Sequence, residues 1–138
     1  MGDNTFHLEV LTPHRKFYEG DVEEIIVTIT SGQMGVLKGH IPMAAALGIG
    51  VFKIKKDGEW KEAFISSGFM EVKRDSVTIL SSAVEWPEEI DIERAKSAKE
   101  RAEEKLRQKK SQQEYVLASA ALRRALMRMQ IANKHKNM

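Results

Sequence analysis

"VFKIKKDGEWKEAFI", residues 51–65, decides the fold class of the first part of the chain. Each of its two halves is a strand-like run. The halves flank Lys56-Asp57-Gly58, a glycine-containing turn of the kind that joins the strands of a β-hairpin. The stretch therefore predicts two neighbouring antiparallel strands.

Strand-like runs also lie on both sides of this hairpin, and the first of them alternates with the period of two residues that is typical of a half-buried strand. "TFHLEVLTP", residues 5–13, places Phe6, Leu8 and Val10 on one face, with polar residues on the other. Further strand-like runs are "VEEIIVTIT", residues 22–30, and "MEVKRDSVTIL", residues 70–80. Short strands separated by closely spaced turns are typical of an antiparallel β-sandwich or a flattened barrel. We predict that this β-domain spans residues 1–86.

The segment "SGQMGVLKGHIP", residues 31–42, has three glycines and a proline. Glycine permits positive φ and close backbone approach, and proline restricts the residue before it. The order of residues is not that of a phosphate-binding P-loop, and His40 is the only strong metal ligand in it. Two interpretations remain: a conformationally special loop between strands, or a docking loop held by a rigid scaffold.

Residues 87–138 have a helical pattern instead, and we predict that they form a second domain. The segment from Asp91 to about Lys110 has no Gly or Pro and is rich in Ala, Glu, Lys and Arg. Its narrow apolar stripe consists of Ile92, Ala95, Ala98, Ala102 and Leu106. Opposite charges on the other face predict ion pairs along the helix, Glu100 with Lys96 and Glu103 with Arg107.

A second helix is predicted from about Gln112 to Asn133. Ser111 and Glu114 match a capping box at its start. Its apolar residues Ala118, Leu122, Ala125 and Met129 recur at helical spacing. Two alanine-lined helices joined by a short polar break predict an antiparallel hairpin. Because alanine buries little area, this hairpin should be marginally stable and able to open.

Composition excludes several classes of function. There are no cysteines among the 138 residues, so disulfides and thiolate chemistry are excluded. The four histidines lack metal-ligand spacing, and no catalytic constellation appears, so we predict a non-enzyme with no metal site. The N-terminus does not resemble a secretory signal, and no apolar stretch approaches the ~20 residues that span a bilayer.

Charge is distributed unevenly along the chain. Residues 1–84 carry 9 basic and 11 acidic side chains, a net of −2, whereas residues 85–138 carry 13 and 9, a net of +4. This basic half raises the hypothesis of nucleic-acid binding. However, acids are interspersed in the helices, and Tyr115 is the only aromatic residue after Trp86, so no base-stacking platform is predicted.

Taken in order, these segments resemble the epsilon subunit of bacterial F-type ATP synthase. "HLEVLTPHRKFYEGDVEEIIV" is similar to the opening strands of that family, and "SGQMGVLKGHIP" to its glycine-rich loop. "SSGFMEVKRDSVTILSSAVE" is similar to its Ser-Gly-Gly-x-x-Glu-Val segment, and the helical hairpin follows at the same distance. The resemblance covers essentially the whole chain.

The resemblance implies a rotor subunit at the foot of the central stalk. It would bind the gamma subunit, touch the c-ring and lie peripherally on the cytoplasmic face of the bacterial membrane. Gln33 and His40 occupy the c-ring-docking positions. Gln33 stands where the family usually has Glu, Met34 where it has Leu, and Lys38 where it has Pro, which leaves the side-chain details of docking open.

The resemblance also implies a regulatory role for the helices. In this family, the folded hairpin permits ATP hydrolysis, whereas the extended hairpin reaches the alpha/beta catalytic head and inhibits it. The basic residues that would face acidic loops of the beta subunits are Arg123, Arg124 and Arg128.

"IDIERA", residues 90–95, is similar to the motif with which some bacterial epsilon subunits bind ATP. The ATP-binding positions implied by the resemblance are Glu85, Ile90, Asp91, Arg94, Ala95, Arg124 and Arg128. ATP would be a regulatory ligand that is not hydrolysed, and whether Mg²⁺ accompanies it is left open. Arginine suits phosphates because its guanidinium donates bidentate, charge-assisted hydrogen bonds.

Two alternatives stand beside this expectation. Asp91 is a good N-cap without any ligand, and Arg94 could pair with it three residues on. The chain could then be an epsilon subunit with a purely structural and coupling role, whose hairpin ignores ATP. The whole-chain resemblance and the two arginines of the second helix favour ATP binding.

Overall fold

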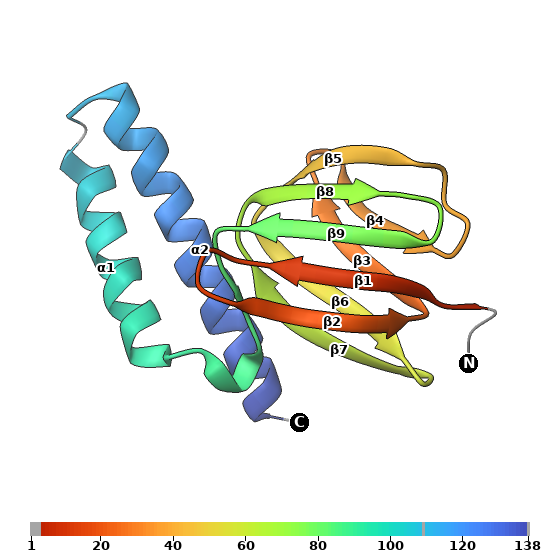
Figure 1. The fold of residues 1–138 in the computed structure, drawn as a ribbon. Coiled ribbons are helices and arrows are strands. Elements are labelled where there is room, and N and C mark those ends of the chain that lie inside the picture. Colours follow the sequence, from red (N-terminus) through yellow and green to blue (C-terminus); the bar gives the residue numbers. More distant parts are fainter. Residues whose placement is uncertain (1–3, 109, 138) are drawn as a thin grey trace. The chain divides into compact units, whose positions relative to one another are not determined.

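The computed structural model describes residues 4–108 and 110–137. The chain forms two compact units, and the division falls between Glu85 and Trp86. Of the elements in the described residues, the strands lie in the first unit and the two long helices in the second (Figure 1). This confirms the predicted class, a β-domain followed by a helical pair.

The described residues of the first unit form ten strands. They are β1 (Phe6–Leu11), β2 (Lys16–Val22), β3 (Glu24–Ile29), β4 (Gly32–Leu37), β5 (Met43–Leu47), β6 (Gly50–Lys56), β7 (Glu59–Ile65), β8 (Gly68–Val72), β9 (Ser76–Ser81) and β10 (Val84–Glu85). Sheet A has the order β2-β1-β9-β8-β5, and sheet B has the order β10-β7-β6-β3-β4. The two sheets lie face to face as a sandwich (Figure 1). All pairs are antiparallel except β1 with β9, which is parallel.

The core of the sandwich follows the period-2 pattern of the strands. The predicted inward residues of β1, Phe6, Leu8 and Val10, are all buried, while His7 between them is exposed. Phe52 and Ile54 of β6 are buried in the same alternating manner. Alternation therefore sorts these strands into a core face and an outer face, whereas β7 ends with three consecutive buried residues, Ala63, Phe64 and Ile65.

The turn at 56–58 is the tight hairpin that the sequence predicts. Asp57 and Gly58 have φ angles of 53° and 77°, the left-handed pair that a two-residue hairpin needs. The Gly58 amide donates a hydrogen bond to Glu23 Oε1 at 2.8 Å, which ties the turn to the start of β3.

The prediction that residues 31–42 form a loop is wrong for half of the segment. Residues 32–37 form β4, which pairs with β3 over its full length and is the edge strand of sheet B. The glycine content misled the prediction, because an edge strand tolerates glycine at exposed positions. The loop itself is limited to the residues after Leu37, where Gly39 has a φ of 82°.

The second unit consists of a short 3₁₀ helix, Pro87–Glu89, and two long helices, α1 (Ile92–Gln108) and α2 (Gln112–Lys136). Asp91 caps α1, since its Oδ1 accepts a hydrogen bond from the Arg94 amide at 3.0 Å. Ser111 caps α2 by accepting from the Glu114 amide at 3.1 Å. No hydrogen bond from the Glu114 carboxylate back to Ser111 is found in the described residues, so only half of the predicted capping box forms.

The predicted helix boundaries and ion pairs need correction. The first helix ends at Gln108, before Lys110, and the second continues to Lys136. Lys109 lies outside the described residues. Arg107 pairs with Glu104 at 2.7 Å and not with Glu103, which lies 4.0 Å from Lys99. Residues three apart and residues four apart both lie on one helix face, so the sequence alone does not show which glutamate pairs with Arg107.

A charged network covers one end of sheet A, on β1 and β2. His7 Nε2 lies 3.0 Å from Glu19 Oε2, and its Nδ1 lies 3.4 Å from Asp21 Oδ1. Lys16 bridges Glu19 and Glu9. The hydrogen bond to Glu19, with a smaller contribution from Asp21, raises the pKa of His7 above its ordinary value.

We expect this raised pKa to make sheet A slightly more stable at acidic than at alkaline pH. The added stability is fully present below the unfolded-state pKa of His7 and is lost as pH rises through the folded-state pKa. An NMR titration of the imidazole should give a midpoint above that of an unfolded peptide, and Glu19→Gln should lower it. An unchanged midpoint in Glu19→Gln would contradict this assignment.

Gly68 is predicted to be intolerant of any side chain. A Cβ at this position would lie 2.1 Å from the carbonyl oxygen of Leu80 on the neighbouring strand. Gly68→Ala should therefore destabilise the fold by about 1–3 kcal/mol. Gly20→Ala is the matched control, because its nearest neighbour would lie at 3.6 Å, an ordinary contact. Equal melting temperatures for the two variants would contradict the prediction.

Candidate functional site

The two long helices of the second unit meet along a seam of alanines. Ala95 and Ala102 of α1 and Ala118 and Ala125 of α2 are each 4% exposed or less. All four belong to the stripes predicted from the sequence. A methyl group buries little apolar area, so each alanine stabilises the contact between the helices by only a fraction of the free energy that a leucine would contribute.

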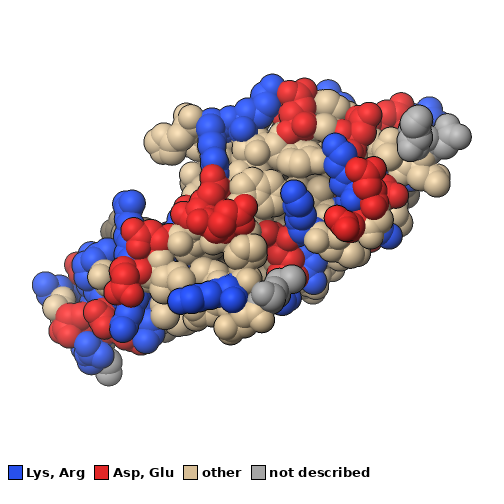
Figure 2. Space-filling view, turned by 90° about the horizontal axis from the view of Figure 1, so that it is seen from below, with Lys and Arg blue, Asp and Glu red and all other residues tan. Residues whose placement is uncertain are grey.

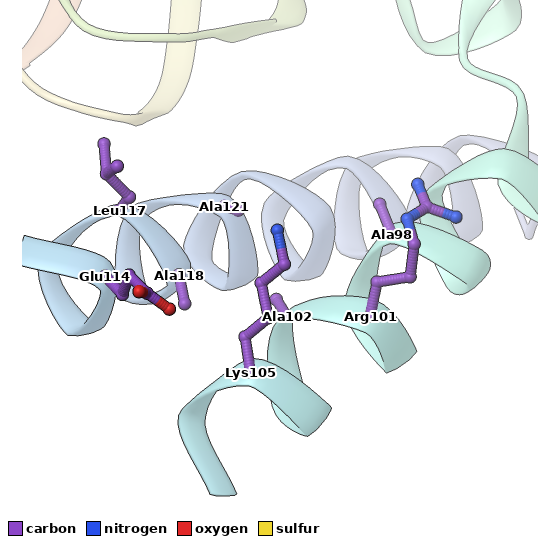
Figure 3. Close-up of a pocket in the computed structure, with 8 residues that line it drawn as sticks. All are labelled: Ala98, Arg101, Ala102, Lys105, Glu114, Leu117, Ala118 and Ala121. Atoms are coloured by element: carbon purple, nitrogen blue, oxygen red, sulfur yellow. The ribbon is translucent and has the colours of Figure 1, made fainter. Parts of the chain in front are cut away.

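A cleft of about 300 Å³ opens beside this seam (Figure 3). Its walls are alanines of both helices, and its charged lining residues are Arg101 and Lys105 of α1 and Glu114 of α2. Figure 3 shows the side chains of Arg101 and Lys105 leaving α1 on the side that faces α2. None of these three side chains makes an ion pair within the described part of the chain, so the two cations are available to an anion.

Helical spacing extends this cleft to the arginines singled out from the sequence. Arg94 precedes Arg101 by seven residues, and Arg124 follows Leu117, another lining residue, by seven. Seven residues are close to two turns, so each arginine lies on the same helix face about 10 Å farther from the α1–α2 turn. Arg128 lies one further turn along α2. One flank of the hairpin therefore carries five cations.

The structure places the remaining predicted ATP-binding residues at different points. Asp91 caps α1, and Ile90 before it is buried. Ala95 belongs to the alanine seam. Glu85 is the last residue of β10 and belongs to the first unit. Arg123, predicted to contact beta subunits, is exposed on α2, whereas Arg124 and Arg128 are half-buried.

This flank suits an anionic ligand better than a metal ion. Guanidinium and ammonium groups bind phosphates, and the free amides at the start of α1 add partial positive charge. The described residues contain no group of three or more His, Asp or Glu side chains arranged to hold a metal ion.

Sequence reasoning missed Arg101 and Lys105. They lie seven and eleven residues after Arg94, and spacings of seven and eleven return to the same helix face. Applying that periodicity to charged residues, and not only to apolar ones, would have found them.

A second candidate surface lies on the outer face of sheet A. Strand register aligns Ala46, Phe69, Leu80 and Leu11 in one row across four strands. Phe69 is 49% exposed and Leu80 is 50% exposed, and a shallow cavity of about 550 Å³ lies against them. We call these four residues the apolar row.

The row beside it on the same face is acidic. It contains Glu71, Thr78, Glu9 and Glu19, which are aligned by the same pairings. An apolar row flanked by acids is typical of a protein interface with a partner that presents apolar and basic residues.

The two predicted c-ring positions do not converge. Gln33 is exposed near the start of β4, whereas His40 lies in the loop after its end. The His40 amide donates to the Leu37 carbonyl at 3.1 Å, and its Nδ1 lies 2.8 Å from the Ile41 carbonyl oxygen. Ile41 beside it is 77% exposed, so the loop presents a large apolar side chain that sequence reasoning did not single out.

Surface charge is mixed on the face seen in Figure 2, where Lys and Arg side chains alternate with Asp and Glu. That face therefore offers no extended basic patch of the kind nucleic acid requires. Within the described residues, neither helix combines the length and apolarity that crossing a membrane would demand.

Comparison with known proteins gives the same two-part division. The family "ATP synthase, Delta/Epsilon chain, beta-sandwich domain" matches residues 5–87, and "ATP synthase, Delta/Epsilon chain, long alpha-helix domain" matches residues 88–133. A chain of the mitochondrial ATP synthase of Euglena gracilis, solved with OSCP, F1 and the c-ring, has a similar fold. Its TM-score is 0.77 at 23% identity, over 97% of this chain and 82% of that one.

Sequence relatives are closer. The ATP synthase epsilon chain of Caldanaerobacter subterraneus subsp. tengcongensis is 73% identical over 99% of both chains. That of Halalkalibacterium halodurans is 44% identical over 94% of this chain and 98% of its own. The chain thus belongs to the family of ATP synthase epsilon chains, non-catalytic subunits of the central stalk of the F-type enzyme.

Proposed function

We propose that this subunit couples the catalytic head to the c-ring and that its helical hairpin regulates ATP hydrolysis. The hairpin inhibits hydrolysis when it extends along the stalk to the alpha and beta subunits. ATP binds the folded hairpin as a signal, is not hydrolysed, and holds it folded. The subunit would lie peripherally on the cytoplasmic face of the bacterial membrane.

One observation carries the nucleotide part of this proposal: the cationic flank that both helices share. Arg94, at the capped start of α1, and Arg124 and Arg128 of α2 lie on the two sides of the seam. A triphosphate bound to both helices would exist only when the helices are together. The free energy of ATP binding therefore stabilises the folded hairpin. The polyphosphate could also bind Mg²⁺ as a companion ion.

The weak seam makes such a signal effective. A ligand that binds only the folded form, at ten times its dissociation constant, stabilises that form by about 1.4 kcal/mol. This corresponds to roughly a tenfold shift in population. An alanine seam is weak enough for that shift to matter, whereas a leucine seam would hold the hairpin folded without ATP.

Arg124 and Arg128 also explain why the two states exclude each other. In the extended state they and Arg123 would face acidic loops of the beta subunits. A guanidinium engaged with ATP phosphates cannot at the same time pair with those carboxylates. ATP thus opposes inhibition in two ways: it holds the helices together and occupies the inhibitory cations.

Arg94→Ala should weaken ATP binding roughly tenfold or more, because a charge-assisted bidentate contact is lost. Calorimetric titration of ATP into the isolated chain measures this, with ADP as a second ligand. Arg107→Ala is the matched control, since Arg107 is exposed on α1 and paired with Glu104. Equal affinities for the two variants, or no saturable binding of ATP to the unmodified chain, would contradict the proposed site.

Asp91→Ser separates capping from ligand binding. Serine also caps helices, so the stability of α1 should be retained. If the Asp91 carboxylate contacts the nucleotide, ATP affinity falls while the helical circular dichroism signal and its melting stay the same. Unchanged affinity would limit Asp91 to the role of an N-cap.

We propose further that the apolar row of sheet A faces the gamma subunit. Four apolar side chains in register make a flat strip, and exposed apolar area of this kind favours association. The adjacent acidic row would attract basic residues of gamma and fix the register of the two proteins. The loop after β4, with His40 and the exposed Ile41, together with Gln33, would remain available to the c-ring.

The double substitution Phe69→Asp with Leu80→Asp should abolish association with gamma, because it places two charges in the centre of the apolar row. Co-purification or surface plasmon resonance with isolated gamma measures this. Trp60→Asp is the control, since Trp60 is 42% exposed but lies on sheet B. Loss of binding in the control, with the double variant unaffected, would assign gamma to the other sheet.

The alternative is a subunit that only couples and whose hairpin does not respond to ATP. It predicts normal gamma binding in every variant of the hairpin and no ATP binding up to millimolar concentrations.

A further inference from the structure

The two edges of sheet A are protected very differently against pairing with another chain. At one edge, β2 carries Lys16, Glu19 and Asp21 at exposed positions, and its pairing with β1 is irregular between Val10 and Leu11. Charges and irregular register are the devices by which natural sheets block further strand addition. The edge formed by β2 is therefore closed to a partner strand.

The opposite edge has neither device. β5, "MAAAL", residues 43–47, contains no charge, proline or bulge, and pairs in regular register with β8 along its full length. In the part of the chain that the structure describes, β5 pairs with no other strand on its outer side. Alternate amides and carbonyls of an edge strand point away from the sheet, so β5 presents unpaired backbone groups.

Small side chains make this edge easy to approach. Ala44 and Ala46 are exposed, and a methyl group leaves the neighbouring backbone accessible to an incoming chain. The Gly48 amide donates to the Thr28 carbonyl of β3 at 2.9 Å, which fixes the end of β5 to the other sheet. The edge is thus open and also held in place.

The open edge continues the apolar row. Ala46 is both an exposed residue of β5 and the outermost member of that row, followed by Phe69 and Leu80. A partner lying on the apolar row would reach β5 without crossing any charged side chain. Phe69 and Leu80 provide apolar burial, and β5 provides backbone hydrogen bonds to the same partner.

β4, the edge strand of sheet B, lacks this combination. It is also uncharged, but Gly32 and Gly35 make it less suited to hold a partner strand. On the outer face of sheet B, the row that begins at Gly35 of β4 continues through Ile26 of β3 to Lys53 of β6, which lies 3.8 Å from Glu62. In the described residues, no apolar row leads to the edge formed by β4.

We propose that β5 accepts an extended segment of the gamma subunit as an additional strand of sheet A. The segment would pair its backbone with Met43–Leu47 and continue over the apolar row, a mode of recognition known as β-augmentation. This inference rests on the proposed docking of gamma to sheet A and specifies its geometry. It makes β5 a recognition element that acts through its backbone and not through its side chains.

Hydrogen exchange of the full-length chain, free and bound to purified gamma, tests the proposal. In the free chain, the edge-facing amides of β5 should exchange as fast as those of an unpaired strand. In the complex their exchange should slow at least tenfold at alternate residues, because only every second amide faces the partner. The amides of β2 and β4 are internal controls and should keep their rates.

The outcomes separate the two proposals. If the complex forms but the β5 amides keep their exchange rates, gamma docks on the apolar row alone and strand addition is wrong. Protection of β4 in place of β5 would assign the partner strand to sheet B and would equally overturn the inference. If no complex forms, the docking proposal fails and this inference fails with it.

A proline pair supplies a second test that does not depend on exchange. Ala44 and Ala45 are consecutive, so one of their amides faces β8 and the other faces the open edge. Proline at the edge-facing position should leave the melting temperature nearly unchanged, because an edge strand tolerates it there. The same variant should bind gamma about tenfold more weakly, the loss expected from one or two hydrogen bonds. Unchanged binding by both folded proline variants would overturn strand addition.

Discussion

The alanine seam between α1 and α2 is the constraint on which the proposed regulatory role of this protein depends. Alanine at Ala95, Ala102, Ala118 and Ala125 lets the helix backbones approach closely but gives them little apolar surface to share. We therefore expect the free-energy difference between the folded and the opened hairpin to be small. A seam of this kind can be biased by charges on its flank, which is where the cations of both helices lie.

The β-sandwich, in contrast to the alanine seam, has a core of large apolar side chains. Buried residues alternate with more exposed ones along β1, β6 and β9, and large residues such as Leu8, Phe52 and Ile79 fill a fully buried core. Sheet A then combines a closed edge at β2, an acidic row, an apolar row and an open edge at β5. The proposed function thereby joins a docking platform and an ATP-responsive hairpin in one chain.

Periodicity was enough to predict most of this fold. The alternation in residues 5–13, the strand-like runs in residues 51–65 and the alanine stripes around Ala102 and Ala118 are local patterns that the folded structure retains. The parallel pairing of β1 with β9 could not be predicted, because it joins residues about seventy positions apart. Residues 32–37 were predicted as loop because local glycine preference suggested it, whereas tertiary pairing with β3 decided the outcome.

The candidate site was predictable only in part, for a related reason. Arg94 and Asp91 stand in a recognisable local motif, but Arg101 and Lys105 line the cleft only because α2 folds back beside α1. Likewise, the apolar row unites residues from four strands that are scattered along the sequence. A site whose residues come from several paired strands can be predicted only when the pairing register of those strands is known. No local sequence pattern specifies that register.

The central claim is that ATP stabilises the closed hairpin by binding to its cationic flank. Hydrogen exchange of the seam amides, around Ala102 and Ala118, measures hairpin opening directly in the isolated chain. At ten times the dissociation constant of ATP, exchange through opening should slow about tenfold, and ADP at equal concentration should have a smaller effect. If ATP is bound but the seam exchanges at an unchanged rate, the nucleotide does not control the hairpin and the account is wrong.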